Sequence, residues 1–129
     1  MILAIDPGKD KCGLAVLDRQ GSVLEKKVLP REHVLNALPY FVAKYGITSV
    51  VVGRSASGKE LEREIAKTDL RISLVFVSEK YSTLEARKRY WKENKPKGLM
   101  RLIPTSLRVP PEPVDDYAAV ILGERFLAG

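Results

Sequence analysis

The sequence predicts an α/β fold, in which three antiparallel and two parallel strands form a five-stranded mixed sheet with helices on both faces. Three observations carry this prediction. Residues 2–6, 47–52 and 72–77 are short, largely apolar runs, typical of strands that are covered on both faces. Segments with apolar side chains at helical spacing lie before the run at 47–52 and after the run at 72–77. Three closely spaced strands followed by strands reached through helices make such a mixed sheet.

The first thirty residues predict an antiparallel meander. Residues 2–6 (ILAID) form a strand that ends at a Pro-Gly turn, and residues 13–18 (GLAVLD) form the second strand. The segment 19–22 contains Gly21 and predicts a tight hairpin turn. Residues 22–29 alternate around a charged centre, which indicates a third strand at the edge of the sheet.

A helix is expected over residues 32–45, because apolar side chains recur there at helical spacing: Val34, Leu35, Leu38, Phe41, Val42 and Tyr45. Pro39 lies inside this segment and is expected to bend or split the helix, since proline removes one backbone hydrogen bond. Gly46 is expected to end it.

The second half alternates strands and helices. A buried strand over 47–52 precedes a loop over 53–58 and a charged helix over 59–67. Another buried strand follows over 72–77. The next helix is predicted over 83–93, where Ser82 and Glu85 have the spacing of a capping box.

The end of the chain is predicted to hold a long irregular stretch and a final helix. Residues 94–113 contain five of the eight prolines and one glycine, which predicts a loop, and long loops of this kind are often functional. The last helix is expected over 114–127.

Composition limits the class of protein. A chain of 129 residues with 45% hydrophobic residues fits one globular domain. It has no apolar run of about 18 residues and no signal peptide, so no membrane association is expected. Cys12 is the single cysteine, which favours a reducing compartment and a cytoplasmic location. The net charge of +6 favours a polyanionic partner.

Three acidic residues are candidate site residues, because each lies where a strand ends or a helix begins: Asp6, Glu79 and Asp115. Carboxylates in such places can converge on a metal ion, as open-sheet sites gather past strand ends. Each also has an ordinary structural explanation. Asp6 suits an Asp-Pro-Gly turn, Glu79 suits a loop residue paired with Lys80 or Lys11, and Asp115 suits the N-terminus of a helix.

Helical geometry separates Asp115 from its neighbour Asp116. The apolar face of the last helix is predicted to consist of Val114, Tyr117, Ala118, Ile121 and Leu122. Asp115 lies on the border of that face and can look toward the sheet. Asp116 points nearly opposite, so we expect it to face water, although it remains a candidate auxiliary ligand.

Several basic residues are candidates for contact with a nucleic acid. Lys9 and Lys11 flank the first turn, Lys80 follows Glu79, and Arg87 opens a stretch of basic and aromatic residues that ends at Lys95. Within that stretch Trp91 is expected to cover the core. Two further candidates lie in the proline-rich stretch: Arg101 and Arg108. Solvated surface charge is the alternative for all of them.

Four segments resemble the RuvC-type Holliday-junction resolvases and their YqgF relatives. The opening IDPGKDKCGLAV is similar to their first-strand signature, and VVVGRSASG to a Val-Val-Gly-Leu-Pro segment. SEKYSTLEAR is similar to the YqgF motif of Asp-Glu-Arg followed by Leu, Ser or Thr, Thr and Glu-Ala-Arg. VDDYAAVILGERFL is similar to the last-helix signature. These four segments occur in the family's order and span nearly the whole chain.

The resemblance implies a ribonuclease-H-like nuclease with Asp6, Glu79 and Asp115 as its acidic triad. It also implies maturation of a small-subunit ribosomal RNA precursor or resolution of branched DNA. The chain departs from the pattern at Ser78, where relatives usually have Asp, and at Lys80, where they usually have Arg. Arg54-Ser55 replaces Leu-Pro, and the proline-rich stretch before Asp115 is longer. These departures leave the three carboxylates intact and bear on the substrate.

The chemistry expected of this triad depends on divalent cations. Two ions about 4 Å apart stabilise the attacking and leaving oxygens of a phosphodiester. Mg²⁺ or Mn²⁺ prefers oxygen ligands and retains waters. We expect Asp6 to be shared by two ions, with Glu79 and Asp115 each completing one of the two sites.

Two other functions stay open. One is a nucleic-acid-binding module without catalysis, which the changes at Ser78 and Lys80 leave open. The other is a nucleotide-binding domain of the actin and sugar-kinase type, which also begins with a strand, an Asp-x-Gly turn and a second strand. That fold needs two such domains, and this chain has no second Asp-x-Gly hairpin. A homodimer is a further expectation from the resemblance, since a four-way junction has two-fold symmetry.

Overall fold

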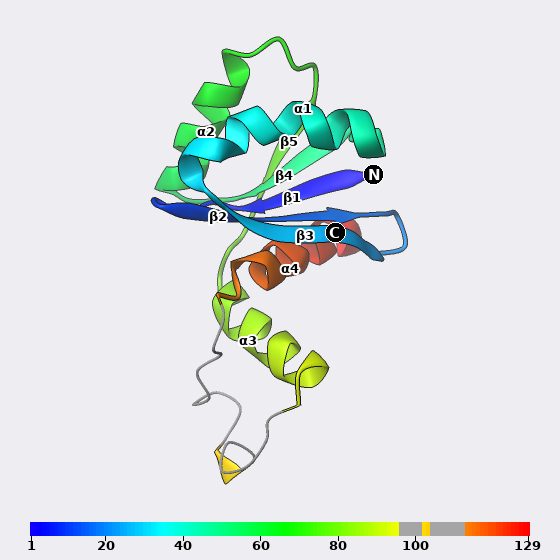
Figure 1. Cartoon of the computed structure of the whole chain (residues 1–129), viewed down its shortest axis with the longest axis vertical. Coiled ribbons are helices and arrows are strands. Elements are labelled where there is room, and N and C mark those ends of the chain that lie inside the picture. The colour runs from blue at the N-terminus through cyan, green and yellow to red at the C-terminus, as the bar shows by residue number, and fades with distance from the viewer. Residues whose placement is uncertain (96–101, 104–112) are drawn as a thin grey trace.

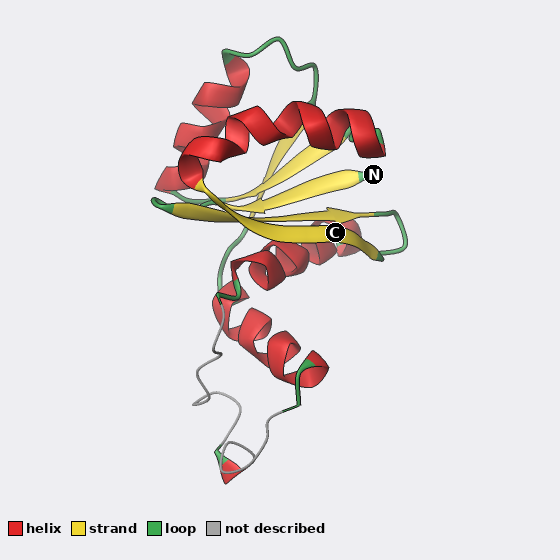
Figure 2. Ribbon diagram, in the orientation of Figure 1, coloured by secondary structure: helices red, strands yellow, loops and turns green. Residues whose placement is uncertain are grey.

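The computed structural model describes residues 1–95, 102–103 and 113–129. Its centre is a five-stranded sheet in the order β3-β2-β1-β4-β5 (Figure 2). The antiparallel strands are β1 (Ile2–Asp6), β2 (Lys11–Leu17) and β3 (Val23–Pro30). The strands parallel to β1 are β4 (Ser49–Gly53) and β5 (Ser73–Val77). The predicted mixed sheet is confirmed, and its strand order is that of the ribonuclease-H-like fold.

Helices cover both faces of the sheet, as predicted (Figure 1). The helices α1 (Val34–Tyr45) and α2 (Ala56–Ala66) lie on one face. On the other face lies α4 (Asp115–Ala128), and α3 (Ser82–Glu93) packs against the outer side of α4. The molecule therefore has four layers in the order α1 and α2, sheet, α4, α3.

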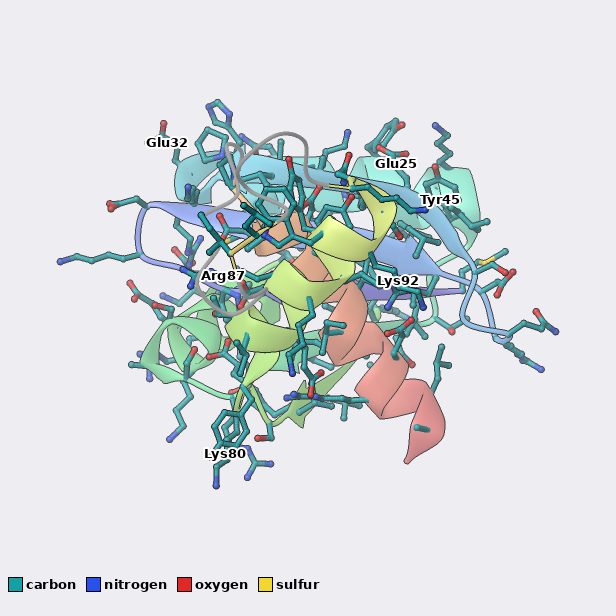
Figure 3. All side chains as sticks on the ribbon, turned by 90° about the horizontal axis from the view of Figure 1, so that it is seen from below. Glu25, Glu32, Tyr45, Lys80, Arg87 and Lys92 are labelled. Atoms are coloured by element: carbon teal, nitrogen blue, oxygen red, sulfur yellow. The ribbon has the colours of Figure 1, made fainter. Side chains whose placement is uncertain are left out.

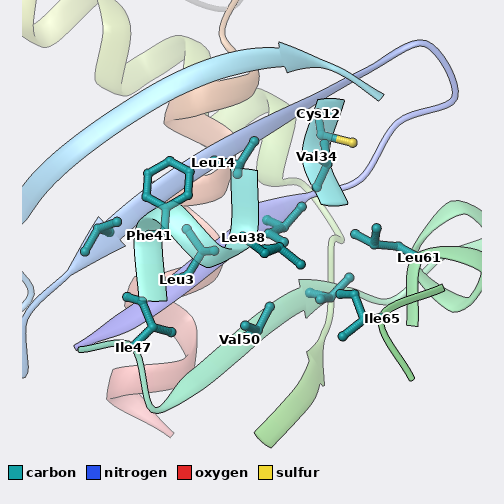
Figure 4. Close-up of a cluster of buried hydrophobic side chains, with 13 residues drawn as sticks. Leu3, Cys12, Leu14, Val34, Leu38, Phe41, Ile47, Val50, Leu61 and Ile65 are labelled. Carbon is teal, nitrogen blue, oxygen red and sulfur yellow. The ribbon is translucent and has the colours of Figure 1, made fainter. Parts of the chain in front are cut away.

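Alternation along β1 decides which face each side chain reaches. Leu3 and Ile5 belong to the core under α1 and α2 (Figure 4), whereas Ile2 and Ala4 belong to the core under α4. Successive side chains of a strand point to opposite faces. Asp6 therefore lies on the α4 face, at the end of the strand.

Helix α1 runs without a break across Pro39, so of the two expected effects, a bend or a split, the split does not occur. Pro39 is exposed, and the carbonyl that it leaves without a backbone donor can be hydrated. The buried side chains of Val34, Leu38 and Phe41 hold the opposite side of the helix against the sheet. Residues 31–33, of which the last two were expected to be α-helical, form a 3₁₀ turn instead, η1 (Arg31–His33).

We expect Pro39→Ala to stabilise the protein by about 1–2 kcal/mol, because alanine restores a hydrogen bond and removes a ring clash. The greater freedom of the unfolded alanine chain offsets part of the gain. Urea unfolding of the two proteins measures the difference. An equal or lower free energy of unfolding in the variant would contradict this account.

Two helix starts differ from the prediction. Helix α2 begins before Lys59, because the hydroxyl of Ser55 accepts a hydrogen bond from the Gly58 amide at 3.0 Å and caps the helix. The capping box predicted at the start of α3 is wrong. Ser82 is already helical, Tyr81 is the N-cap residue, and the Glu85 carboxylate pairs with Arg125 at 3.2 Å.

Helix α4 is buried on most of its circumference. Every residue from Tyr117 to Gly123 is buried, since the helix lies between the sheet and α3. None of the helices in the described part of the chain is long and apolar enough to cross a membrane.

Candidate active site

The structure brings the three predicted acids to one edge of the sheet. Asp6 ends β1, and Glu79 lies just past the end of β5, which runs in the same direction as β1. Asp115 is the first residue of α4. The three are near enough for the charges of Glu79 and Asp115 to raise the pKa of Asp6.

A glycine on β2 allows Asp115 to approach. Gly13 pairs with Asp6 in the β1–β2 ladder. A Cβ atom at Gly13 would overlap the backbone carbonyl of Asp115 and the amide of Asp116. The absent side chain therefore lets the first turn of α4 lie directly on the sheet beside Asp6.

A second glycine on β4 admits Glu79. Val52 pairs with Ile5, so the next residue, Gly53, flanks the end of β1 on the side opposite to Gly13. A Cβ atom at Gly53 would overlap the side chain of Glu79, including its Oε1 atom. Asp6 thus lies between two glycines. Asp115 occupies the space over Gly13, and Glu79 occupies the space over Gly53.

Sequence reasoning missed the role of these two glycines. The apolar pattern placed Gly13 only in a strand and Gly53 only in a loop. The available signal was a glycine within or directly after an otherwise apolar strand, which often marks a place where another part of the chain approaches closely.

The acids are held at a cost in electrostatic free energy. The pKa of Asp6 is raised to about 7, first by burial, then by the charges of Glu79 and Asp115, and by a hydrogen bond to Glu79. Burial also raises the pKa of Glu79, although its hydrogen bond with Asp6 acts in the opposite direction. Carboxyl groups whose pKa values are raised by burial and by neighbouring acids are typical of a functional site.

Two carboxylate oxygens in this group are buried without a hydrogen-bond donor among the described residues: Glu79 Oε1 and Asp115 Oδ2. Lys11 Nζ lies 3.4 Å from Asp115 Oδ2, which is an ion pair without hydrogen-bond geometry. Buried polar atoms are rarely left without a partner, and such exceptions call for an unseen ligand or a functional reason.

These residues fit a hard divalent cation in chemistry, though they do not form a closed set of ligands. The ligand atoms would be carboxylate oxygens, two of them without a hydrogen-bond donor among the described residues, around an Asp with a raised pKa. No three His, Cys, Asp or Glu side chains of the described residues are placed to hold one ion together. Mg²⁺ commonly binds through one or two carboxylates, with waters and substrate phosphate completing its shell.

The ordinary explanation of Glu79 as a surface ion pair finds no support in the described residues. Neither Lys11 nor Lys80 pairs with it there, because Lys11 pairs with Asp115 and Lys80 lies over the Tyr81 ring at 5.3 Å. The metal-ligand roles of the three acids stay predictions.

Asp116 is placed differently from the expectation. It was expected to face water, yet its side chain is 15% exposed, against 31% for Asp115. Asp116 Oδ2 pairs with Lys26 Nζ of β3 at 3.1 Å. The expectation was wrong because α4 is covered by β3 on one side and α3 on the other, so one apolar face does not describe it. The ion pair with Lys26 also occupies the carboxylate that was a candidate auxiliary ligand.

Of the predicted basic residues, Lys9, Lys11 and Lys80 are exposed, and Lys11 pairs with Asp115. Lys80 extends away from the body of the molecule (Figure 3). Arg87 is half-buried on α3, and the prediction that Trp91 belongs to the core is confirmed. The last two candidates, Arg101 and Arg108, lie outside the described residues, as does most of the predicted irregular stretch.

Comparisons with known proteins do not identify a family. No protein-family model matches the chain, and no curated protein matches it. Among solved structures, the chain is similar to a Listeria monocytogenes protein described as "a putative N-acetylmannosamine kinase", with 16% identity and a TM-score of 0.42. The match covers 73% of this chain and 40% of that one. At this TM-score the likeness supports no argument about function, and an α/β fold is compatible with a nuclease and with a nucleotide-binding domain alike.

Proposed function

We propose that this protein is a divalent-metal-dependent endonuclease of the YqgF and RuvC-like type, which hydrolyses phosphodiester bonds in structured RNA or branched DNA. One observation supports the proposal most. Asp6, Glu79 and Asp115 come from three distant segments to one sheet edge, and two of their oxygens are buried without donors in the described part of the chain.

In this proposal Asp6, Glu79 and Asp115 would hold Mg²⁺ or Mn²⁺. The bound cation would neutralise charge on the phosphate and lower the pKa of a water. Burial and the neighbouring acids raise the pKa of Asp6 to about 7, and a bound cation would stabilise its ionised form. The buried surroundings strengthen each electrostatic contact.

Three exposed lysines would bind the substrate. Lys9, Lys11 and Lys80 carry charges that can contact phosphates of a nucleic acid. Lys11 would exchange its ion pair with Asp115 for a phosphate as the cation arrives. The net charge of +6 supports a polyanionic substrate.

Two further parts of the proposal are a homodimer, which the family resemblance supports, and a cytoplasmic location, which the single cysteine supports. A junction with two-fold symmetry suits a dimeric enzyme. The single cysteine, Cys12, is buried, and one cysteine forms no internal disulfide, which suits a reducing compartment.

Cleavage assays test the activity. Purified protein is incubated with a hairpin-rich ribosomal RNA precursor and with a four-way DNA junction, each with Mn²⁺. We expect cleavage of one of them by the wild type and none by Asp6→Asn. Equal cleavage by both proteins would indicate a contaminant and end the nuclease proposal. Thermal stabilisation by ATP in place of Mn²⁺ would favour the nucleotide-binding alternative.

Removal of the metal is expected to abolish cleavage without unfolding the protein. The acids lie at the edge of a sheet whose two faces are each covered by an apolar core, so we expect the fold to form without a bound cation. Circular dichroism before and after chelation measures the fold, and added Mn²⁺ should restore the activity. Unfolding on chelation would show that the cation has a structural role instead.

A further inference from the structure

The segment that carries Glu79 is tied to α4 by one side chain. Arg125 donates from Nη1 to the carbonyl of Ser78 at 2.7 Å and from Nη2 to the carbonyl of Lys80 at 2.7 Å. The two carbonyls flank Glu79 in sequence. The guanidinium therefore grips the backbone on both sides of the candidate ligand.

Apart from those with Arg125, the backbone hydrogen bonds of this segment in the described part of the chain are local or made with the end of β4. The Lys80 amide donates to the Ser78 hydroxyl at 3.2 Å, and the Arg54 amide donates to the Val77 carbonyl at 2.8 Å. β5 is an edge strand that ends at Val77, so the carbonyls that follow have no neighbouring strand to pair with. The chain then leaves the sheet and passes to α3 on the side of α4 (Figure 1). The Ser82 amide donates a hydrogen bond to the Glu79 carbonyl at 2.9 Å, which closes the turn.

The turn also contains a residue in an unfavourable conformation. Tyr81 has a φ of 63°, the left-handed region, and is the only residue other than glycine with a positive φ in the described part of the chain. A bulky side chain in this region costs about 1–2 kcal/mol. The local sequence therefore does not favour the turn, and contacts from elsewhere must stabilise it.

Arg125 is itself held in position. Its Nη2 atom lies 3.2 Å from Glu85 Oε1, in the first turn of α3, and its side chain is 26% exposed. A planar guanidinium can donate to two carbonyls at once, whereas a lysine ammonium provides only a point charge. One residue thus connects α4, α3 and the Glu79 segment.

We propose that Arg125 is a positioning residue for the cation site: it fixes the Ser78–Lys80 backbone so that the Glu79 carboxylate lies over Gly53 beside Asp6. This inference rests on the proposed function, since it assigns Arg125 a role at the proposed cation site. Arg125 acts through the backbone and contacts neither the cation nor the substrate.

The test compares Arg125→Gln with a matched control, Arg89→Gln. Arg89 also links α3 to α4, through two hydrogen bonds of 3.0 Å to Glu124, and its ion pairs among the described residues are with Glu93 and Glu124, not with the Glu79 segment. Two quantities are measured: the Mn²⁺ affinity by calorimetry, and the hydrogen exchange of the Ser82 amide by NMR.

We expect Arg125→Gln to weaken Mn²⁺ binding by about 10-fold or more, the usual effect of losing an outer contact to a metal ligand. Exchange of the Ser82 amide should become faster in the same variant. Arg125→Lys should give a smaller loss, and Arg89→Gln should leave both quantities unchanged even if it lowers the free energy of unfolding.

Three outcomes would overturn the positioning role. They are unchanged Mn²⁺ affinity in Arg125→Gln, unchanged Ser82 exchange, and equal losses in the Arg89→Gln control. If the wild type itself takes up no Mn²⁺, the cation site fails, and with it the positioning of a ligand. Faster Ser82 exchange in that case would leave Arg125 only a structural contact of the turn.

Discussion

Asp6→Asn is expected to make the protein more stable at pH 8 while abolishing its proposed activity. The pKa of Asp6 is raised from 3.8 to about 7 by burial and by the charges of Glu79 and Asp115. At pH 8 the folded protein therefore holds a carboxylate that would be better solvated in the unfolded chain. Asparagine has nearly the same shape and no charge, so it removes this penalty.

The direction of the pH dependence follows from proton binding. Because the pKa of Asp6 is higher in the folded state, the folded protein keeps a proton that the unfolded chain loses between about pH 4 and pH 7. Its contribution to stability falls as the pH rises through this window. Each pKa unit corresponds to about 1.4 kcal/mol, so the upper limit of the effect is about 4 kcal/mol.

Urea unfolding at pH 5 and pH 8 measures this effect. We expect Asp6→Asn to exceed the wild type by about 2–4 kcal/mol at pH 8 and by much less at pH 5. Saturating Mn²⁺ should narrow the difference at pH 8, because binding to the folded wild type stabilises it. Asp10→Asn, at an exposed position in the following turn, is the control and should show no such gain. Equal stability of wild type and Asp6→Asn at pH 8 would refute the account.

Gly53→Ala is expected to remove the proposed cation site and leave the fold intact. A Cβ atom at this position would overlap Oε1, Cγ and Cδ of Glu79, which must then turn away from the sheet. The backbone at Gly53 does not have a positive φ, so alanine fits the strand itself. We expect Mn²⁺ affinity to fall by about 10-fold or more, with a change in stability below about 1 kcal/mol.

Gly13→Ala is the informative comparison, because the new Cβ atom would meet backbone atoms, whereas in Gly53→Ala it would meet a flexible side chain. The new Cβ would overlap the Asp115 carbonyl, so α4 must move from the sheet or the strand must distort. Overpacking of this kind costs about 1–3 kcal/mol. Calorimetry measures the Mn²⁺ affinity of the two variants, and urea unfolding measures their free energy of unfolding, so a loss of binding can be distinguished from a loss of stability. Wild-type Mn²⁺ affinity in Gly53→Ala would show that Glu79 does not belong to the site.

Most of the fold was predictable because it depends on the periodicity of apolar residues. The apolar runs at 2–6, 47–52 and 72–77 predicted strands, and strands were found at all three. The prediction that the strand over 72–77 is buried is wrong, because β5 lies at the edge of the sheet and its residues are exposed or half-buried. Two of the failures occurred at helix starts, where single contacts decide. The Ser55 hydroxyl accepts a hydrogen bond from the Gly58 amide, so α2 begins earlier than predicted. The Glu85 carboxylate pairs with Arg125 and does not form the predicted capping box of α3.

Part of the site was predictable for the same reason. Residues that end parallel strands meet at one edge, so the order of strands and helices alone indicates that Asp6 and Glu79 lie near each other. Asp116 was misplaced because the helical face was interpreted as if only the sheet covered α4. The contribution of α3 as an outer layer depends on a cluster that joins the two helices, and helical spacing alone does not tell which helices pack together. The cluster consists of Ala86, Tyr90, Trp91, Tyr117 and Ala118.

The sequence by itself determined the mixed sheet, the helices on its two faces and the three acids at the ends of their elements, because these follow from local patterns of polarity. Only the tertiary structure decided how the acids are accommodated. It placed Gly13 and Gly53 on either side of Asp6 and turned Arg125 onto the backbone around Glu79. The physical reason is that close packing and hydrogen bonds between distant segments depend on the register of the strands and the roll of the helices, and no short-range pattern in the chain encodes either of them.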